Sequence, residues 1–217
     1  MNRANRPSFA SRGTTSLPGV AIVTTGRNPP LLRRLIAEWL GLGHSVVCAL
    51  PDAALVAEAP GLCVLRLPTS GRDFGVAWDA AIDACPPGDV YLGADDVLPC
   101  GGDWSGLAKA PADAICAVRL VSATGQRWAD WARFDGLRVE NLAYDVRDPG
   151  AYISGNAMVL RGRARDVVRW SGRGWHHGDD ILASWGAVQA GIALIPPFAG
   201  GAAACPPRSP ATMQRRP

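Results

Sequence analysis

Two adjacent aspartates, Asp95 and Asp96, directly follow the apolar run 90–92. The run predicts a short buried strand, and residues at the carboxyl end of such a strand lie on the rim of an open α/β sheet, where ligands bind. Adjacent carboxylates repel each other unless a cation or a donor lies between them. Carboxylate oxygens suit Mg²⁺ or Mn²⁺, which also hold substrate phosphates. The pair therefore indicates a divalent metal site, although by itself it is explained at least as well by the start of a surface turn.

A second acidic pair, Asp179 and Asp180, directly precedes a helix predicted over 181–190. An acid in this position is most often an N-cap, and we assign that role to Asp179. The helix N-terminus stabilises a carboxylate in its ionised form, so we expect Asp180 to be ionised at neutral pH. His176 and His177 come shortly before the pair. The His-His-Gly-Asp-Asp segment could also belong to a metal phosphohydrolase, but the absence of further His/Asp pairs in the sequence argues against this interpretation.

The first half of the chain alternates predicted strands and helices. Asn28 is a good N-cap and Pro29 suits the first helical position, so a helix should begin directly after the first strand. A strand, a helix and a second strand in this order form a βαβ unit, in which the two strands are parallel. This alternation favours a doubly wound α/β sheet. The predicted strands cover 20–25, 45–50, 62–67 and 90–92, and the predicted helices cover 29–40 and 76–84.

The loop after the first strand contains Thr24, Thr25 and Arg27 and lies at the ligand-binding edge of the predicted sheet. Its hydroxyls, its glycine and its arginine could serve a nucleotide or a phosphate group. The loop is neither a P-loop nor a dinucleotide-binding fingerprint, because both glycine patterns are absent.

The second half of the chain differs from the first and predicts antiparallel sheet with aromatic packing. Gly155 interrupts one of its strands, which indicates a bulge or the close approach of a ligand. Trp128, Trp131 and Trp175 could stack on a sugar ring, although core or interface packing is the better explanation for most tryptophans of this chain. The expected elements are strands over 114–121, 151–160 and 192–195, antiparallel sheet over 127–134, an irregular, mobile loop over 136–149, and helices over 161–170 and 181–190.

The composition is that of one globular domain, which we place at 19–197 between flexible tails at 1–18 and 198–217. The 217 residues carry a net charge of +3, and the arginines form only modest clusters, as at Arg161, Arg163 and Arg165. This is not the dense basic stripe of a nucleic-acid-binding protein, although a weak anionic partner stays open. The six cysteines form no C-x-x-C pair and are expected to be free buried thiols. With no apolar run of transmembrane length and no signal-peptide pattern, the expected location is the cytoplasm.

In order and spacing, these segments resemble the inverting glycosyltransferases of family 2, which have the GT-A fold. Residues 20–28 look like the family's first strand and nucleotide loop, and 75–92 resemble the helix and strand that lead into its D-x-D motif. Residues 154–158 are similar to its acceptor-side glycine segment. Asp179-Asp180, followed by 190–192, resembles its E-D motif and trailing helix. The resemblance covers most of the chain and implies an α/β fold with a Rossmann-like nucleotide-binding half, a mixed central sheet and a smaller antiparallel acceptor-side part.

The chain departs from the family's pattern at four positions. Gly93 stands at the first acid of D-x-D, so that Asp95 alone remains of the pair, with Asp96 beside it. Asp79 replaces the family's asparagine in the preceding helix, and the E-D pair is Asp-Asp. An arginine that is common in the last helix would fall near Gly186 and is missing. These differences put metal binding in doubt and raise the alternative of a catalytically lost GT-A domain that binds a nucleotide or sugar or acts as a scaffold.

The resemblance implies inverting transfer of a sugar from a nucleotide-sugar donor, a UDP- or GDP-sugar, to an acceptor hydroxyl with Mn²⁺ or Mg²⁺. A lipid carrier, a protein, a glycan or a modified nucleic acid remains open as the acceptor. A nucleotidyltransferase on a related fold is disfavoured, because its glycine-rich, lysine-bearing N-terminal loop is absent. A surface salt bridge explains Arg72 and Asp73 as well as nucleotide binding does. The implied residues are Asp180 as the catalytic base; Thr24, Thr25, Arg27, Asp52, Arg72, Asp73, Ala94 and Asp95 for the donor nucleotide; Asp95, Asp96 and His177 for the metal; and Gly155, Asn156, Trp175 and Asp179 on the acceptor side.

Overall fold

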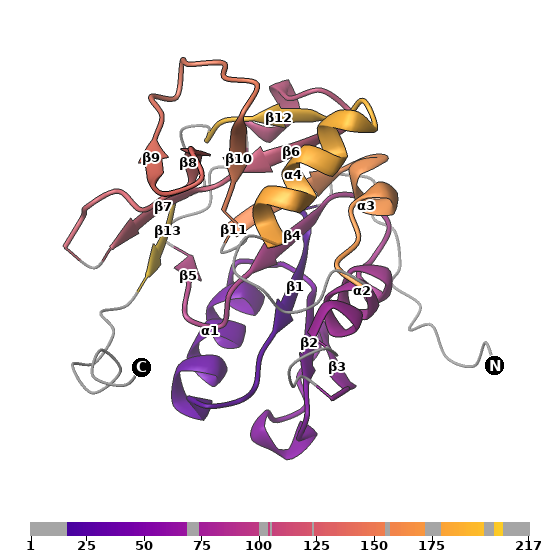
Figure 1. Cartoon of the computed structure of the whole chain (residues 1–217). Helices are drawn as coiled ribbons and strands as arrows, with labels where there is room; N and C mark the ends of the chain where they lie inside the picture. The colour runs from indigo at the N-terminus through magenta and orange to yellow at the C-terminus, as the bar shows by residue number, and fades with distance from the viewer. Residues whose placement is uncertain are drawn as a thin grey trace.

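The computed structural model is shown in Figure 1. Its strands lie side by side through the centre of the view, with helices to either side of them. None of the helices in the described part of the chain is long and apolar enough to cross a membrane. The structure describes residues 17–68, 74–99, 104, 106–122, 124–154, 157–171, 179–197 and 202–205, without the side chains of 179 and 202–205.

The first half of the chain folds as the sequence predicts, with each boundary within about two residues of its expected position. The strands are short and apolar, and β1 and β2 are buried along their whole length. The side chain of Asn28 accepts a hydrogen bond from the backbone N–H of Leu31 (3.3 Å), and Pro29 begins the helix that follows. The elements are β1 (Gly19–Val23), α1 (Pro29–Gly41), β2 (Val46–Leu50), the 3-10 helix η1 (Ala53–Leu55), β3 (Leu62–Arg66), α2 (Phe74–Ala84) and β4 (Val90–Gly93).

The second half breaks into more and shorter elements than the sequence predicts. Many of its strands have only three or four residues, too few for a clear hydrophobic period to show in the sequence. The elements are β5 (Leu98–Pro99), η3 (Leu107–Lys109), β6 (Ala114–Ala117), β7 (Arg119–Ser122), β8 (Trp131–Phe134), β9 (Val139–Asn141), β10 (Ala151–Ile153), β11 (Ala157–Arg161), α3 (Ala164–Val167), α4 (Asp179–Gln189), β12 (Ala193–Ile195) and β13 (Ala202–Cys205).

Within the described residues, the strands form one large sheet and two small ones. The seven-stranded sheet has the order β12-β6-β11-β4-β1-β2-β3, in which β11 alone runs antiparallel to its neighbours. The small sheets have the orders β10-β8-β9 and β5-β13-β7. The expected α/β fold is therefore confirmed: a Rossmann-like half, a mixed central sheet and a smaller antiparallel part.

Five expectations for the second half were wrong in detail. The strand predicted over 114–121 divides into β6 and β7, and the one over 151–160 divides into β10 and β11, because each passes from one sheet to another. The loop predicted over 136–149 contains β9, which pairs with β8. The helix predicted over 161–170 is reduced to α3. The tail predicted from 198 contains β13, whose alanines are poor strand formers but find backbone partners on β7 and β5.

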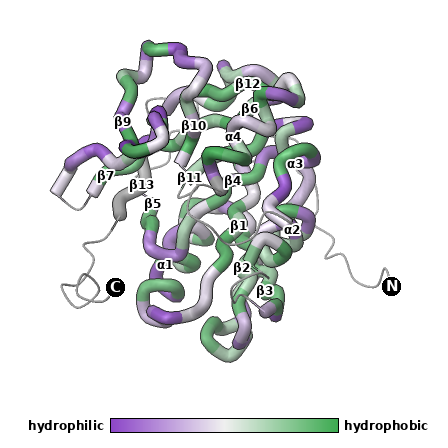
Figure 2. Tube along the Cα trace, viewed as in Figure 1, coloured by the Kyte–Doolittle hydropathy of each residue, from purple (hydrophilic) through white to green (hydrophobic). Residues whose placement is uncertain are grey.

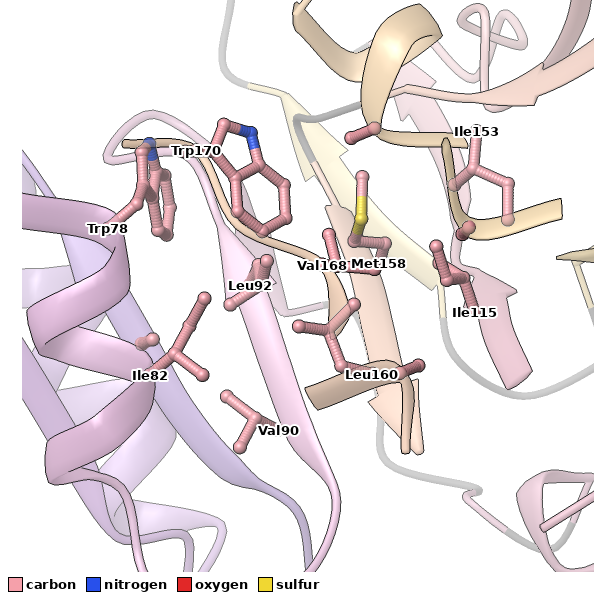
Figure 3. Close-up of a cluster of buried hydrophobic side chains, with 14 of the residues drawn as sticks. Trp78, Ile82, Val90, Leu92, Ile115, Ile153, Met158, Leu160, Val168 and Trp170 are labelled. Atoms are coloured by element: carbon pink, nitrogen blue, oxygen red, sulfur yellow. The ribbon is translucent and has the colours of Figure 1, made fainter. Parts of the chain in front are cut away.

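Two hydrophobic clusters fill the space on either side of the large sheet. One joins α1 to the faces of β1 and β2 that carry Ile22 and Cys48, and the other joins α2 and α4 to the opposite face. Figure 3 shows the second cluster, in which the rings of Trp78 on α2 and Trp170 lie beside each other above Leu92 of β4. In Figure 2, hydrophobic residues follow β1 and β2 through the centre, while hydrophilic residues gather around β9. The central strands are thus held rigidly from both faces.

The arginines near 161 serve the fold. Arg161 forms an ion pair with Asp89 (2.9 Å). Arg165 donates to the backbone carbonyls of Ile82 (2.9 Å) and Cys85 (2.7 Å), and so binds the chain where α2 ends. Contacts within the fold therefore explain Arg161 and Arg165 without a weak anionic partner.

Candidate active site

The centre of the candidate site is the point where the strand order of the large sheet reverses. The chain proceeds from β1 to β2 and β3 on one side and returns to β4 on the other side of β1. In doubly wound sheets, ligands bind in the crevice outside the carboxyl ends of the strands at such a switch point. The residues that follow β1 and β4 are therefore the first candidates for ligand binding, and they include Thr24 and Asp95.

Thr24 and Asp95 are joined directly across this switch point. The Thr24 hydroxyl donates to Oδ2 of Asp95, and Thr24 Oγ1 accepts a hydrogen bond from the backbone N–H of Gly26 (2.9 Å). Ile22 pairs with Gly93 in the sheet, which places the two side chains at the same level beyond the strand ends. Thr24 is only 1% exposed, so its bond fixes the Asp95 carboxylate from the protein side.

The environment of Asp95 is electrostatically unusual. Burial raises the pKa of its carboxyl above the ordinary value, and the negative charge of Asp96 adds to the rise. The hydrogen bond from Thr24 and the positive charge of Arg27 act in the opposite direction on this pKa. Burial also raises the pKa of the Cys48 thiol to about 12, with a further contribution from the Asp95 charge. A desolvated carboxylate of this kind favours a cation beside it.

The donor set fits a divalent cation only when a substrate supplies further ligands. Asp95 and Asp96 are both half-buried in the turn after β4, with Ala94 before them. No group of three or more metal-ligating side chains occurs in the part of the chain that the structure describes. Mg²⁺ commonly binds one or two carboxylates together with substrate phosphates, so two aspartates facing a diphosphate are a sufficient protein contribution. His177, the third expected ligand, lies outside the described residues.

The expected donor-nucleotide residues are only partly brought together. Thr25 and Arg27 are exposed in the loop after β1, beside the Thr24–Asp95 pair. Asp52 is exposed after β2, but its carboxylate caps η1 by accepting from the backbone N–H of Ala54 (3.0 Å). Its observed role is therefore that of a cap. Arg72 and Asp73 lie outside the described residues.

On the acceptor side, Asp180 lies in the first turn of α4, and this helix packs against β10. The hydroxyl of Ser184, one turn later, accepts a hydrogen bond from the backbone N–H of Ile153 (3.1 Å). Burial raises the pKa of the Tyr152 phenol on β10 to about 12, and the negative charge of Asp180 contributes. The helix that carries Asp180 thus packs along β10. The next strand in the chain, β11, pairs with β4, the strand that leads to Asp95. Oδ1 of Asp180 accepts from the backbone N–H of Ile181 (2.9 Å).

The other expected acceptor-side residues give a mixed outcome. Trp131 is 2% exposed and belongs to the core, so it is not a sugar platform. Trp128 is 43% exposed, so stacking on a sugar ring stays a prediction for this residue. The helix α4 begins at Asp179, two residues before its expected start, so Asp179 is the first residue of the helix and the prediction that it is the N-cap was wrong. The residues Gly155, Asn156 and Trp175 lie outside the described part of the chain.

Two of the departures from the family's pattern have a structural explanation. Asp79 accepts hydrogen bonds from the backbone N–H groups of Trp170 (2.9 Å) and Ser171 (3.0 Å), so its carboxylate holds this segment against α2. Gly93 is required by its neighbour, because a Cβ at this position would lie 2.5 Å from Cε1 of Tyr91. The missing first acid thus follows from the aromatic ring that occupies its space.

Sequence reasoning missed Ser184, which ties α4 to β10, and Tyr152 on β10, and it did not foresee that Thr24 would bind Asp95. Ser184 is four residues after Asp180 on a predicted helix, so the two side chains share a face, and this spacing was the available signal. Nothing in the sequence relates Tyr152 or Thr24 to an acid about thirty or seventy residues away. These contacts are products of the sheet order.

No family model matches the sequence, and a search of curated proteins found no match. Among solved structures, the chain is similar to inositol-1-phosphate CTP transferase from T. maritima, with a TM-score of 0.54 and 11% identity over 91% of this chain and 92% of that one. It is also similar to TarS of S. aureus, with a TM-score of 0.52 and 10% identity over 87% of this chain and 60% of that one. These likenesses and the sheet order give the chain a GT-A-type fold.

Proposed function

We propose that this protein transfers a sugar from a nucleotide-sugar donor to an acceptor hydroxyl with inversion, assisted by Mn²⁺ or Mg²⁺. The observation that carries the proposal is the Thr24–Asp95 pair, which places a desolvated carboxylate at the switch point of a GT-A-type sheet. The fold alone hosts more than one chemistry, so the assignment depends on this pair and on Asp180.

The donor diphosphate is proposed to lie beyond the ends of β1 and β4. The loop after β1 presents the exposed Arg27 and Thr25 there, and a guanidinium binds phosphate oxygens in a geometry that suits two hydrogen bonds. Asp95 and Asp96 would hold the divalent cation, which when bound neutralises the charge of the leaving diphosphate. Thr24 keeps the Asp95 carboxylate oriented toward this position.

Asp180 is the proposed base. Inverting transfer requires a group that takes the proton of the acceptor hydroxyl while the anomeric carbon is attacked from the face opposite the leaving group. The first turn of α4 favours the ionised carboxylate, and the Ser184–Ile153 hydrogen bond ties this helix to the end of β10. Asp180 therefore stands on a helix that is fixed to β10, whereas the proposed metal ligands Asp95 and Asp96 follow β4.

A second candidate is a catalytically lost domain that still binds a nucleotide or a sugar. Gly93 and the ring of Tyr91 favour it, because they remove one possible acidic ligand from the strand that carries Asp95. Nucleotidyl transfer, the activity named for the T. maritima protein, uses a similar fold, but this chain lacks a lysine in the loop after β1.

The proposal is tested by titrating UDP and GDP calorimetrically with and without Mn²⁺. Metal-dependent binding is expected, and its absence would refute the proposed function. Asp180→Asn should then lower transfer or donor hydrolysis by roughly 10²- to 10⁴-fold while nucleotide affinity stays nearly constant, which is the range for loss of a general base. Asp166→Asn, which changes an exposed acid of α3, is the matched control and should keep full activity. An active Asp180→Asn variant would exclude Asp180 as the base, and nucleotide binding without any transfer would favour the lost-activity candidate.

A further inference from the structure

Arg119 lies at the same edge of the large sheet as the candidate site. The strands β4 and β6 are both antiparallel to β11, so they run in the same direction and their carboxyl ends share an edge. Ala157 pairs with Gly93, and the backbone N–H of Val118 bonds to the carbonyl of the same Ala157 (3.4 Å). Arg119 is therefore level with the residue after Gly93. With one strand between them, β4 and β6 are roughly 10 Å apart.

Arg119 is placed beside a second arginine and a phenol. The guanidinium of Arg127 lies 4.0 Å from the centroid of the Tyr144 ring. The backbone N–H of Leu120, the residue after Arg119, donates to Oδ2 of Asp130, the same oxygen that accepts the Tyr144 hydroxyl, so the backbone of Arg119 lies beside this phenol. Burial raises the pKa of Tyr144 to about 12, and the positive charge of Arg119 acts in the opposite direction. The backbone carbonyl of Tyr144 also accepts from the side chain of Arg147 (3.3 Å). Three cationic side chains thus gather around one aromatic residue.

The acidic residue next to this cluster, Asp130, already accepts several hydrogen bonds. Asp130 is wholly buried, and its carboxylate accepts from Arg127 Nε (2.8 Å), from the Tyr144 hydroxyl (2.7 Å) and from the backbone N–H of Leu120 (3.0 Å). Its charge is therefore balanced by Arg127. Arg119 is exposed, and its guanidinium forms no ion pair with any residue that the structure describes. Asp145, the acid next to Tyr144 in the sequence, is exposed to solvent.

We propose that Arg119, supported by the Arg127–Tyr144 pair, binds an anionic group of the acceptor, so that the acceptor is an alcohol that also carries a phosphate or a carboxylate. This inference rests on the proposed function, because it assigns the substrate class of the same site. The donor diphosphate is expected beyond β1 and β4, where Arg27 lies, whereas Arg119 lies beyond β6, on the far side of β11. A second anion can therefore bind there without displacing the donor.

The exposed Trp128 lies opposite Leu120 in the hairpin that begins with Arg119. Its backbone N–H bonds to the carbonyl of Leu120 (3.0 Å), so it belongs to the hairpin that starts at Arg119. Figure 1 shows this hairpin projecting from the body beside β7. In this register the Trp128 side chain shares the face of Leu120, whereas Arg119 lies on the other face together with Arg127, so Trp128 is not part of the proposed anion site.

The test compares glycerol 3-phosphate, glycerate and glycerol as probes of the full-length protein. Each is titrated by calorimetry or NMR after the nucleotide site has been saturated with Mn²⁺ and whichever of UDP and GDP binds. We expect one or both anions to bind measurably more tightly than glycerol, and the binding to weaken when NaCl is raised from about 0.05 to 0.5 M. The phosphate and carboxylate arms then identify which anion the site prefers.

Arg119→Ala should weaken anion binding by roughly three- to tenfold, because one solvent-exposed charge-assisted contact is lost. Arg138→Ala, which removes another exposed arginine from the turn between β8 and β9, is the matched control and should leave anion binding unchanged. Nucleotide affinity should stay constant in both variants.

Three results would overturn the inference: equal affinity for glycerol and both anions, equal effects of the two arginine substitutions, or a loss of nucleotide affinity in Arg119→Ala. A wild-type protein without metal-dependent nucleotide binding would refute the proposed function instead. In that case anion binding that requires Arg119 would still establish the anion site, measured without nucleotide.

Discussion

The hydroxyl groups of Tyr91 and Tyr144 offer a matched pair of substitutions. Tyr91 is wholly buried on β4, and its hydroxyl has no hydrogen-bond partner among the residues that the structure describes. Its ring lies against Trp39, with 4.7 Å between the ring centroids, and against Gly93. Tyr144, in contrast, donates its hydroxyl to the buried carboxylate of Asp130 (2.7 Å). Replacing Tyr91 by phenylalanine therefore removes a hydroxyl without a partner among the described residues, whereas the same replacement at Tyr144 removes a hydrogen-bonded hydroxyl.

The two substitutions should change stability in opposite directions. A buried polar group without a partner costs about 1–3 kcal/mol, so Tyr91→Phe should raise the free energy of unfolding by about 1 kcal/mol. Tyr144→Phe removes a hydrogen bond to a carboxylate, and because Tyr144 is half-buried we expect a loss of about 1–2 kcal/mol. For a chain of this length, 1 kcal/mol corresponds to roughly 2–4 °C in Tm. The expected shifts are therefore about +2 to +4 °C for Tyr91→Phe and about −2 to −8 °C for Tyr144→Phe.

Urea unfolding and differential scanning calorimetry measure both effects. Wild type and the two variants should be compared at the same pH, with m-values checked so that a change in midpoint reports stability. A lower Tm for Tyr91→Phe would show that its hydroxyl is hydrogen-bonded and would refute the reasoning. Equal effects of the two substitutions would do the same.

Two further predictions concern the acidic strand end. Gly93→Ala should destabilise the protein, because its Cβ would lie 2.5 Å from a ring carbon of Tyr91. The loss of stability should be smaller when Gly93→Ala is combined with Tyr91→Val. If chemical unfolding shows no loss of stability for Gly93→Ala, this geometry is contradicted. The raised pKa of Asp95 means that the folded state binds a proton more readily than the unfolded chain does. The contribution of Asp95 to the free energy of unfolding therefore rises as the pH falls from the folded-state pKa to the usual value near 3.9. Asp95→Asn should therefore be at least as stable as wild type at pH 7, with the difference shrinking as the pH falls, while metal-dependent nucleotide binding is lost. A variant markedly less stable than wild type at pH 7 would argue against a desolvated Asp95 carboxylate.

Much of the first half of the fold could be predicted because its signals are local. Asn28 and Pro29 start α1, and the apolar runs of β1 and β2 are long enough to be recognised as buried strands. The strands of the second half could not be divided correctly from the sequence, because residues 114–121 predict one continuous strand. The division there depends on which sheet edge offers backbone partners, and a sequence does not contain that information locally.

The residues of the candidate site also divide into those that local sequence signals predict and those that strand order positions. The position of Asp95 after a buried strand and that of Asp180 at a helix start follow from residues close to them in sequence. The contact of Asp95 with Thr24, the tie between Ser184 and Ile153, and the position of Arg119 on the same edge depend on strand order.

The sequence by itself therefore determined the fold class, the two acidic pairs and the elements that carry them, because capping, periodicity and strand length act over a few residues. Only the tertiary structure decided which of these groups meet. It showed that Gly93 is imposed by Tyr91, that Asp79 serves as a backbone clamp and that Trp131 belongs to the core. The physical reason is that burial, desolvation and hydrogen bonding between distant segments arise only when the sheet brings those segments together.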